Sequence, residues 1–159
     1  MSIVNKVSAY LDKNHIQYQV LEHAPSHNSV SSAITANIPV AQLVKGVMLE
    51  DHDGKKLMAI LPATHKVNLI SLNEKLNRQF HLMKEAEIFG LFNDCDHGAV
   101  PPLAEAYNMD LVYDVCLMQQ PYLYLEAGDH KSLIKLTRDE FGQLMHGVEP
   151  LHISHRVFH

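Results

Sequence analysis

Residues 43–63, LVKGVMLEDHDGKKLMAILPA, decide the fold because they form the clearest hairpin pattern in the chain. Two apolar runs, residues 43–50 and 55–63, flank the short polar sequence DHDGK. Asp53 and Gly54 are residue types that adopt the positive φ angles of a tight turn. The segment therefore predicts two long antiparallel strands, and with them a sheet at the centre of the protein.

Periodicity on both sides of the hairpin alternates between helix and strand. Helical spacing covers residues 3–11, 69–78 and 84–92, and residues 29–43 predict a serine-capped helix that is broken at Ile38-Pro39 and followed by a short turn. Thr137 and Glu140 form a capping-box pattern before a helix over residues 137–145. Strand patterns cover residues 18–23, 79–83, 109–114, 115–118, 122–128 and 132–136. These patterns predict a mixed α/β (α+β) fold with a largely antiparallel or mixed sheet of about six or seven strands.

Composition suits one compact domain over residues 1–159, since 47% of the 159 residues are apolar. The net charge of -5 provides no strong attraction to nucleic acid or anionic lipid, so any RNA contact has to be local. The first residues have the pattern of an amphipathic helix and not of a leader, and no apolar run reaches about 18 residues. We therefore expect a cytoplasmic protein with reduced thiols and no membrane partner. The twelve histidines are scattered and form no HxxxH or HExxH pair on a predicted helix, which favours surface or core positions.

Residues 93–103, NDCDHGAVPPL, are unusually rich in reactive side chains and fall in a predicted loop. A metal site there needs three or four convergent ligands, and consecutive residues cannot all point at one ion. A reactive Cys95 needs a base and a lowered pKa, and the sequence indicates neither. The candidate metal ligands are Asp94, Cys95, Asp96 and His97.

The second half of this segment favours a third interpretation, a rigid backbone loop. Gly98 permits close backbone approach, and two adjacent prolines restrict the chain that follows. Such a loop can present unpaired N–H groups to a carbonyl or an oxyanion, although glycine-proline loops also occur as plain turns. The loop consists of Gly98, Ala99, Val100, Pro101 and Pro102.

Five segments in this order resemble the YbaK/EbsC-type aminoacyl-tRNA deacylases: LVKGVML, LMAILPATHKVNL, GAVPPL, YNMDLVYD and YLYLEAGDHKSLIKL. That family includes the editing domain of prolyl-tRNA synthetase and its free-standing trans-editing relatives, and the resemblance extends from about residue 3 to residue 146. It implies a single mixed α/β domain with a curved, partly open sheet. The implied activity is hydrolysis of the ester between a wrongly attached amino acid and the 3′ end of a tRNA. It implies no metal or other cofactor. The implied partners are tRNA and an aminoacyl-tRNA synthetase.

The resemblance also implies roles for individual residues. Lys45 matches a lysine that anchors the terminal adenosine or its phosphate. Gly98 matches the glycine of a GxxxP loop whose backbone, here continued by residues 99–102, binds the aminoacyl carbonyl. His130 matches a histidine that helps to set amino-acid selectivity, with Gly128 and Asp129 beside it. Without the family, an outward-facing lysine, a turn glycine and a surface histidine are the alternatives. Some members carry Asn or Thr after the lysine, and this chain has Gly46.

An aminoacyl ester is already activated, so its hydrolysis needs little more than a positioned water and an oxyanion site. The resemblance implies substrate assistance by the free 2′-hydroxyl of the terminal ribose, and a small amino acid on tRNA-Pro or a similar tRNA as substrate. Two other functions stay open at this stage. One is an inactive module of the same fold that binds a tRNA end or a small metabolite. The other is a metal-dependent hydrolase that uses the histidines with Asp94 and Asp96.

Overall fold

The predicted hairpin forms the centre of the protein. The computed structural model describes residues 4–24, 36–96 and 98–157. Strand β2 (Leu43–Asp51) pairs antiparallel with β3 (Lys56–Pro62) along its whole length, and Gly54 in the turn has a φ of 82°. The Asp51 carboxylate closes the turn, because it accepts hydrogen bonds from the N–H groups of Asp53 and Lys55. The hairpin prediction is confirmed.

Around the hairpin lies an eight-stranded mixed sheet with the order β1-β8-β7-β2-β3-β6-β9, in which β5 also pairs with β2. The pairs β2–β7, β3–β6 and β6–β9 are parallel. The predicted mixed α/β fold is confirmed, with eight strands in the main sheet. The other strands of the main sheet are β1 (Gln19–Glu22), β5 (Phe80–Leu82), β6 (Asp110–Asp114), β7 (Tyr122–Glu126), β8 (Ser132–Thr137) and β9 (Pro150–Leu151). Strands β4 (His65–Val67) and β10 (Ser154–Arg156) form a separate antiparallel ribbon.

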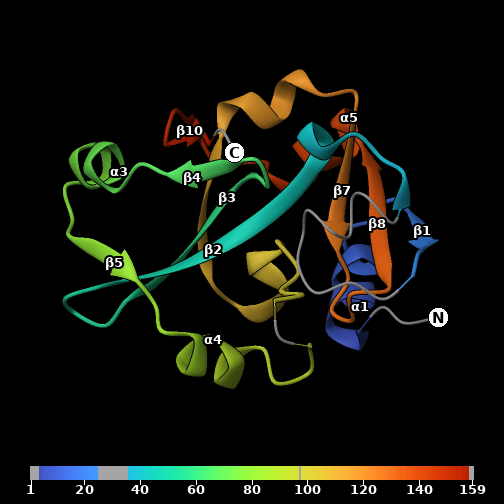
Figure 1. Ribbon diagram of the computed structural model, residues 1–159, viewed down its shortest axis with the longest axis horizontal. Coiled ribbons are helices and arrows are strands. Elements are labelled where there is room, and N and C mark those ends of the chain that lie inside the picture. Colours follow the sequence, from blue (N-terminus) through green and yellow to red (C-terminus); the bar gives the residue numbers. More distant parts are fainter. Residues whose placement is uncertain (1–3, 25–35, 97, 158–159) are drawn as a thin grey trace.

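Helices surround the sheet, with α4 and α5 on opposite sides of the molecule in Figure 1. The helices are α1 (Asn5–Lys13), α3 (Leu69–Leu76), α4 (Glu85–Leu91) and α5 (Arg138–Leu144). The Thr137/Glu140 capping box at the start of α5 is present as predicted. The helix predicted to start at residue 29 falls largely outside the described residues. In the described part of the chain, no helix is long and apolar enough to cross a membrane.

Residues 115–118, predicted to be a strand, instead lie in a 3₁₀ helix, η3 (Val115–Gln119). The reason is a cap: the Asp114 carboxylate accepts a hydrogen bond of 2.9 Å from the Cys116 N–H, which turns the chain out of the sheet. Two further 3₁₀ segments are η1 (Val40–Gln42) and η2 (Ala104–Tyr107).

The hairpin is buried on both faces, which explains why both of its strands have nearly continuous apolar runs. Val44 and Met48 of β2 face one apolar cluster, which also contains Phe92 and Phe141. Leu49 faces a second cluster on the opposite side, together with residues of β3, α3 and β6. The alternation of side chains along β2 therefore places Val44 and Met48 in one cluster and Leu49 in the other.

Buried Asp114, at the end of β6, connects three segments of the chain. Besides the Cys116 N–H, its carboxylate accepts hydrogen bonds from the Ile153 N–H at 3.1 Å and the Ser154 hydroxyl at 2.6 Å. Burial raises the pKa of Asp114, but the hydrogen bonds from Cys116, Ser154 and Ile153 outweigh it and lower the pKa below its usual value. The charged carboxylate thus holds the C-terminal segment against the sheet.

Replacing Asp114 by Asn should therefore lower the free energy of unfolding by roughly 1–3 kcal/mol, because an amide oxygen cannot satisfy all of these donors. Asp110→Asn, an exposed position on the same strand, is the matched control and should change little. Chemical denaturation measures both. The difference should be present at neutral pH and shrink as the pH falls through the lowered pKa of Asp114. Equal stability of the two variants would contradict this role.

Candidate functional site

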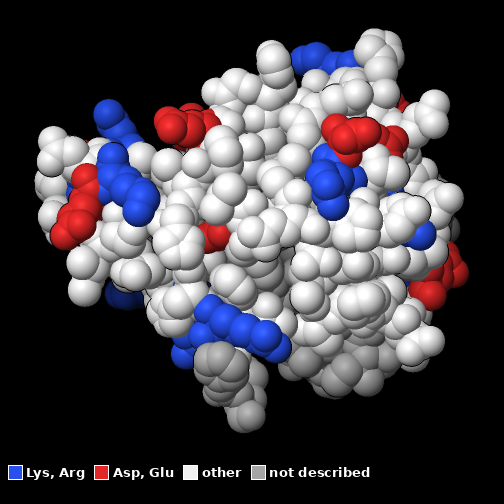
Figure 2. Space-filling view, turned by 90° about the horizontal axis from the view of Figure 1, so that it is seen from above, with Lys and Arg blue, Asp and Glu red and all other residues white. Residues whose placement is uncertain are grey.

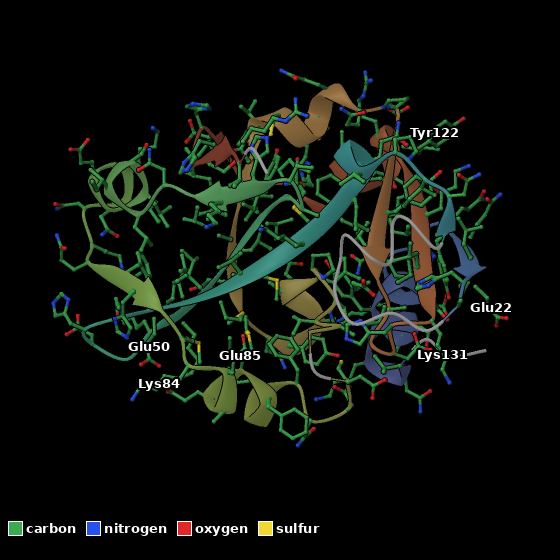
Figure 3. All side chains as sticks on the ribbon, in the orientation of Figure 1. Glu22, Glu50, Lys84, Glu85, Tyr122 and Lys131 are labelled. Atoms are coloured by element: carbon green, nitrogen blue, oxygen red, sulfur yellow. The ribbon has the colours of Figure 1, made fainter. Side chains whose placement is uncertain are left out.

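A pocket of about 310 Å³ lies at the free edge of β2. It lies among β2, the β5–α4 connection, the first turns of α4, the loop after residue 97 and the end of β7; Figure 3 shows Glu85 at the start of α4, near β2. A larger hollow of about 520 Å³ lies between β1, β7 and β8, on the side of Tyr122, but it contains none of the predicted site residues. The smaller pocket is lined by Lys45, Gly46, Val47, Met48, Leu82, Met83, Glu85, Ile88, Gly98, Val100 and Glu126.

The pocket exists because the second edge of β2 is only partly paired. Strand β7 pairs with Leu43 and Val44, and β5 pairs with residues 49–51, so residues 45–48 have a partner strand on the β3 side alone. The Leu43 carbonyl accepts a hydrogen bond from the Ala63 N–H on the β3 side. The Met48 carbonyl accepts a hydrogen bond from the Met83 N–H on the other side. Backbone groups alternate in direction along a strand. The N–H and C=O of Gly46 therefore face the pocket.

Gly46 also lets the loop after residue 97 approach the strand. A Cβ atom at Gly46 would lie 2.8 Å from the Met58 sulfur and 3.4 Å from the Pro102 Cα atom. Both neighbours are buried, so they have little room to move. A side chain at this position would press on the core and on the loop together.

The GAVPP loop contributes Gly98 and Val100 to the pocket wall. Among the described residues, no acceptor is hydrogen-bonded to the N–H of Gly98 or of Val100, and both residues line the pocket. Gly98 is exposed and has a φ of 75°, a left-handed conformation that glycine adopts without strain. Ala99, Pro101 and Pro102 are buried and hold the loop in place. The loop thus combines buried supporting residues with two N–H groups that have no acceptor among the described residues.

Lys45 places a cation in the same pocket. Burial lowers the pKa of Lys45, and the positive charge of Lys66 lowers it further. Within the described part of the chain, Lys45 forms no ion pair. A half-buried cation without an acidic partner reduces stability, which is typical of a binding site for an anion or a polar ligand.

The segment of Gly128, Asp129 and His130 does not line the pocket but supports the loop beside it. The Gly128 carbonyl accepts a 2.7 Å hydrogen bond from the Asp96 N–H, and a Cβ at Gly128 would lie 2.8 Å from Val4. Asp129 caps the next turn by accepting from the N–H groups of Lys131 and Ser132. His130 is 8% exposed and has a φ of 57°. Its role in selectivity stays a prediction.

The side chains of Asp94 and Cys95 face Tyr107 and not the pocket. The Cys95 sulfur lies 3.3 Å from the Tyr107 hydroxyl and 3.3 Å from an Asp94 carboxylate oxygen. Burial raises the pKa of Cys95 to about 12, with a contribution from Asp94, and this disfavours the reactive thiolate. The described residues, which leave out His97, contain no group of three or more potential metal ligands.

Sequence reasoning missed two carboxylates of the pocket, Glu85 and Glu126, and its apolar wall of Met48, Met83 and Ile88. Glu126 is 1% exposed and ends the apolar run YLYL of β7. A charged residue directly after a buried apolar run is a signal that could have identified Glu126 from the sequence. Residues of the apolar wall were not distinguishable from other core residues.

Known proteins resemble this chain in sequence and in fold. The model of the aminoacyl-tRNA editing domain family matches residues 23–144. No curated protein matches the chain. A solved hypothetical protein, APE2540, has a TM-score of 0.84 at 21% identity, and the match covers 95% of this chain and 100% of that one.

Two further solved structures are similar in fold. A protein described as a candidate trans-editing enzyme for prolyl-tRNA synthetase has a TM-score of 0.78 at 18% identity, over 94% of this chain and 95% of that one. A candidate signal transduction protein from Marinobacter aquaeolei VT8 has a TM-score of 0.79 at 19% identity, over 96% of this chain and 31% of that one. At these identities the structures establish the fold alone.

The close contact at Gly46 predicts opposite effects of alanine at two glycines. Gly46→Ala should lower the free energy of unfolding by roughly 1–3 kcal/mol, since the new Cβ meets Met58 and Pro102. Gly90→Ala, in α4, meets nothing within 4 Å and should stabilise the protein by roughly 0.5–1 kcal/mol. Thermal and chemical unfolding measure both. A Gly46→Ala variant as stable as the wild type would show that Met58 moves freely and that the loop does not depend on this contact.

Proposed function

The chain belongs to the aminoacyl-tRNA editing domain family, and from that membership we propose that it is a free-standing deacylase of mischarged tRNA. The observation that supports this most directly is the content of one pocket. It combines the Lys45 ammonium group, which has no ion-pair partner in the described chain, with two backbone N–H groups that have no acceptor there. An aminoacyl ester on a terminal ribose needs both kinds of group.

The proposed reaction is attack of water on the aminoacyl carbonyl carbon. The carbonyl oxygen becomes an oxyanion and accepts hydrogen bonds from the Gly98 and Val100 N–H groups, which have no other acceptor among the described residues. The bond between the acyl carbon and the ribose oxygen then breaks, and the proton released by the water passes to that oxygen. The free 2′-hydroxyl of the ribose helps to orient the water, and Lys45 holds the ribose or its phosphate. No step requires a metal.

A small amino acid is the proposed substrate side chain. The pocket of about 310 Å³ must hold the terminal ribose together with the aminoacyl group, and Met48, Met83 and Ile88 leave an apolar space for the rest. Glu126 and Glu85 provide negative charge near the substrate's α-ammonium group. His130 and Asp129 act indirectly in this scheme, through the segment whose Gly128 carbonyl holds the loop. The proposed setting is the cytoplasm.

A panel of mischarged tRNAs, assayed with and without a chelator, tests the activity and the role of Lys45. Wild-type protein should hydrolyse at least one member of the panel at a rate that chelation leaves unchanged. Lys45→Met should reduce kcat/KM by roughly 10²-fold or more, and removal of an unpaired half-buried charge should not lower stability. Lys131→Met, at an exposed position, is the control.

Three results would contradict the proposal in different ways. No hydrolysis of any panel member would favour a module that only binds a tRNA end or a metabolite. Loss of activity with the chelator, restored by zinc, would favour metal chemistry. Full activity of folded Lys45→Met would remove Lys45 from the mechanism.

The loop mechanism predicts that a backbone change matters more than a nearby thiol. Gly98→Val should lower kcat by roughly 10²-fold, the scale of losing an oxyanion donor, because a β-branched residue is strained at a φ of 75°. Cys95→Ser should retain most of the activity, since the buried thiol takes no part in the reaction. Single-turnover deacylation by folded variants measures both. An inactive Cys95→Ser beside an active Gly98→Val would overturn the backbone mechanism.

A further inference from the structure

The hollow of about 520 Å³ on the side of Tyr122 takes no part in the proposed reaction. Strands β1, β8 and β7, which are neighbours in the sheet (Figure 1), provide most of its lining. Its volume is in the range of about 300–1,000 Å³ that is typical of small-ligand sites. In Figure 3, Tyr122 lies well apart from Glu85, which lines the pocket of about 310 Å³ that contains Lys45, here called the ester pocket. The two spaces share no described lining residue.

The register of the three strands brings two tyrosines, a lysine and a glutamine onto one face of the sheet. Lys135 of β8 lies opposite Tyr124 of β7 and opposite Gln19 of β1, and residues directly opposite each other share a face. Tyr122 is two residues from Tyr124 on the same strand and therefore shares this face as well. Tyr124 is 7% exposed and Tyr122 is 43% exposed, so the face is covered at one tyrosine and open at the other.

The Lys135 ammonium group is held by aromatic rings and keeps its hydrogen-bond donors available. Its Nζ atom lies 4.4 Å from the centre of the Tyr122 ring and 5.9 Å from the centre of the Tyr124 ring. Attraction to a ring face restricts the lysine side chain but supplies no oxygen acceptor to its N–H groups. Within the described chain, Lys135 forms no ion pair. The ammonium group is therefore already in position to bind an anion, so little side-chain freedom is lost on binding.

The charges around Lys135 leave its positive charge without a partner in the hollow. Among the described residues of the lining, Glu140 alone carries a carboxylate. Its Oε1 atom already accepts hydrogen bonds from the Thr137 N–H at 3.1 Å and the Thr137 hydroxyl at 3.0 Å. Figure 2 shows Lys and Arg side chains in small separate groups on the face in view, so attraction of anions to that face is local. With an overall charge of -5, a ligand with few negative charges suits the hollow.

We propose that this hollow is a second binding site, for a nucleotide whose phosphate contacts Lys135 and whose base packs against the exposed part of the Tyr122 ring. The amide groups of Gln17 and Gln19, at the β1 side, are suited to the polar edge of the base or to the ribose hydroxyls. An ammonium group beside an aromatic ring is the combination that binds single nucleotides with little preference among bases. The site goes beyond the proposed reaction, because it lies outside the ester pocket. The nucleotide is either free or one residue of an RNA strand, and the first test separates the two.

The first test is calorimetric titration of the protein with AMP, with adenosine and with a single-stranded adenine oligoribonucleotide. AMP should bind about tenfold more tightly than adenosine, which lacks the phosphate. An oligonucleotide that binds more tightly than AMP and displaces it would identify the ligand as part of an RNA strand. An oligonucleotide that binds no more tightly than AMP would identify a free nucleotide. No binding of AMP, or equal binding of AMP and adenosine, would overturn the proposal.

The second test places the nucleotide in the hollow. Lys135→Gln and Tyr122→Leu should each weaken the binding of AMP by about tenfold, because one removes the phosphate contact and the other the stacking surface. Lys135→Arg keeps the cation and should retain most of the affinity. Lys131→Gln, at the exposed position just before β8, removes the same charge and is the matched control. Circular dichroism checks that each variant is folded, and wild-type affinity in both folded variants would contradict the site.

Lys45→Met separates the hollow from the ester pocket, and this variant should still bind AMP. Loss of AMP binding in Lys45→Met, with unchanged binding in Lys135→Gln and Tyr122→Leu, would place the nucleotide in the ester pocket and overturn the proposal. None of these titrations requires hydrolysis of an ester. A protein that hydrolyses no mischarged tRNA but binds AMP through Lys135 would therefore refute the deacylase proposal alone.

Discussion

The candidate site depends on one interruption in the hydrogen bonding of β2. The strand is paired on one edge along its whole length, but on the other edge β7 ends its pairing at Val44 and β5 begins at Leu49. A continuous partner strand there would fill the pocket and cover the backbone of Gly46. An unpaired edge normally invites association with another strand. Here the gap is only four residues long and is bordered by α4 and the GAVPP loop, so it can accept a small group and not a sheet.

The rigidity of the segments around this gap matters because a side-chain substitution cannot introduce a backbone N–H or C=O group. The position of such a group depends on the conformation of the chain. The GAVPP loop is held by two buried prolines and by the packing of Pro102 beside Gly46. The hydrogen bond from the Asp96 N–H to the Gly128 carbonyl holds the chain just before it. Contacts of Asp94 and Cys95 with the Tyr107 hydroxyl hold the residues that precede this loop. The side chains of Asp94 and Cys95 therefore have a supporting position, and the donors without an acceptor among the pocket's described residues Gly98 and Val100 belong to peptide bonds.

The sequence predicted those parts of the fold and the site that are determined locally. The β2–β3 hairpin and the α5 capping box each depend on adjacent residues. The backbone role of the Gly98 loop, inferred from adjacent residues in the same way, stays a prediction. The gap along β2 depends on where β5 and β7 stop, which is a property of strands far apart in the chain. Glu126 likewise reads in the sequence only as the polar end of a strand, and the folded structure is needed to show that it lines the pocket. The η3 turn was predictable in principle from Asp114, but the apolar run VCLM favoured a strand.

The charge distribution shows why net charge is a poor guide to the partners of this protein. Lys45 and Lys66 repel each other without a compensating acid in the described chain, so their closeness costs stability in the free protein. An anion that binds between them removes that cost, which makes its binding more favourable than a surface lysine alone would allow. The excess negative charge of the whole chain repels a polyanion at most other places. A polyanionic partner would therefore make only local contact, and the overall charge of -5 would favour contact near the pocket that contains Lys45.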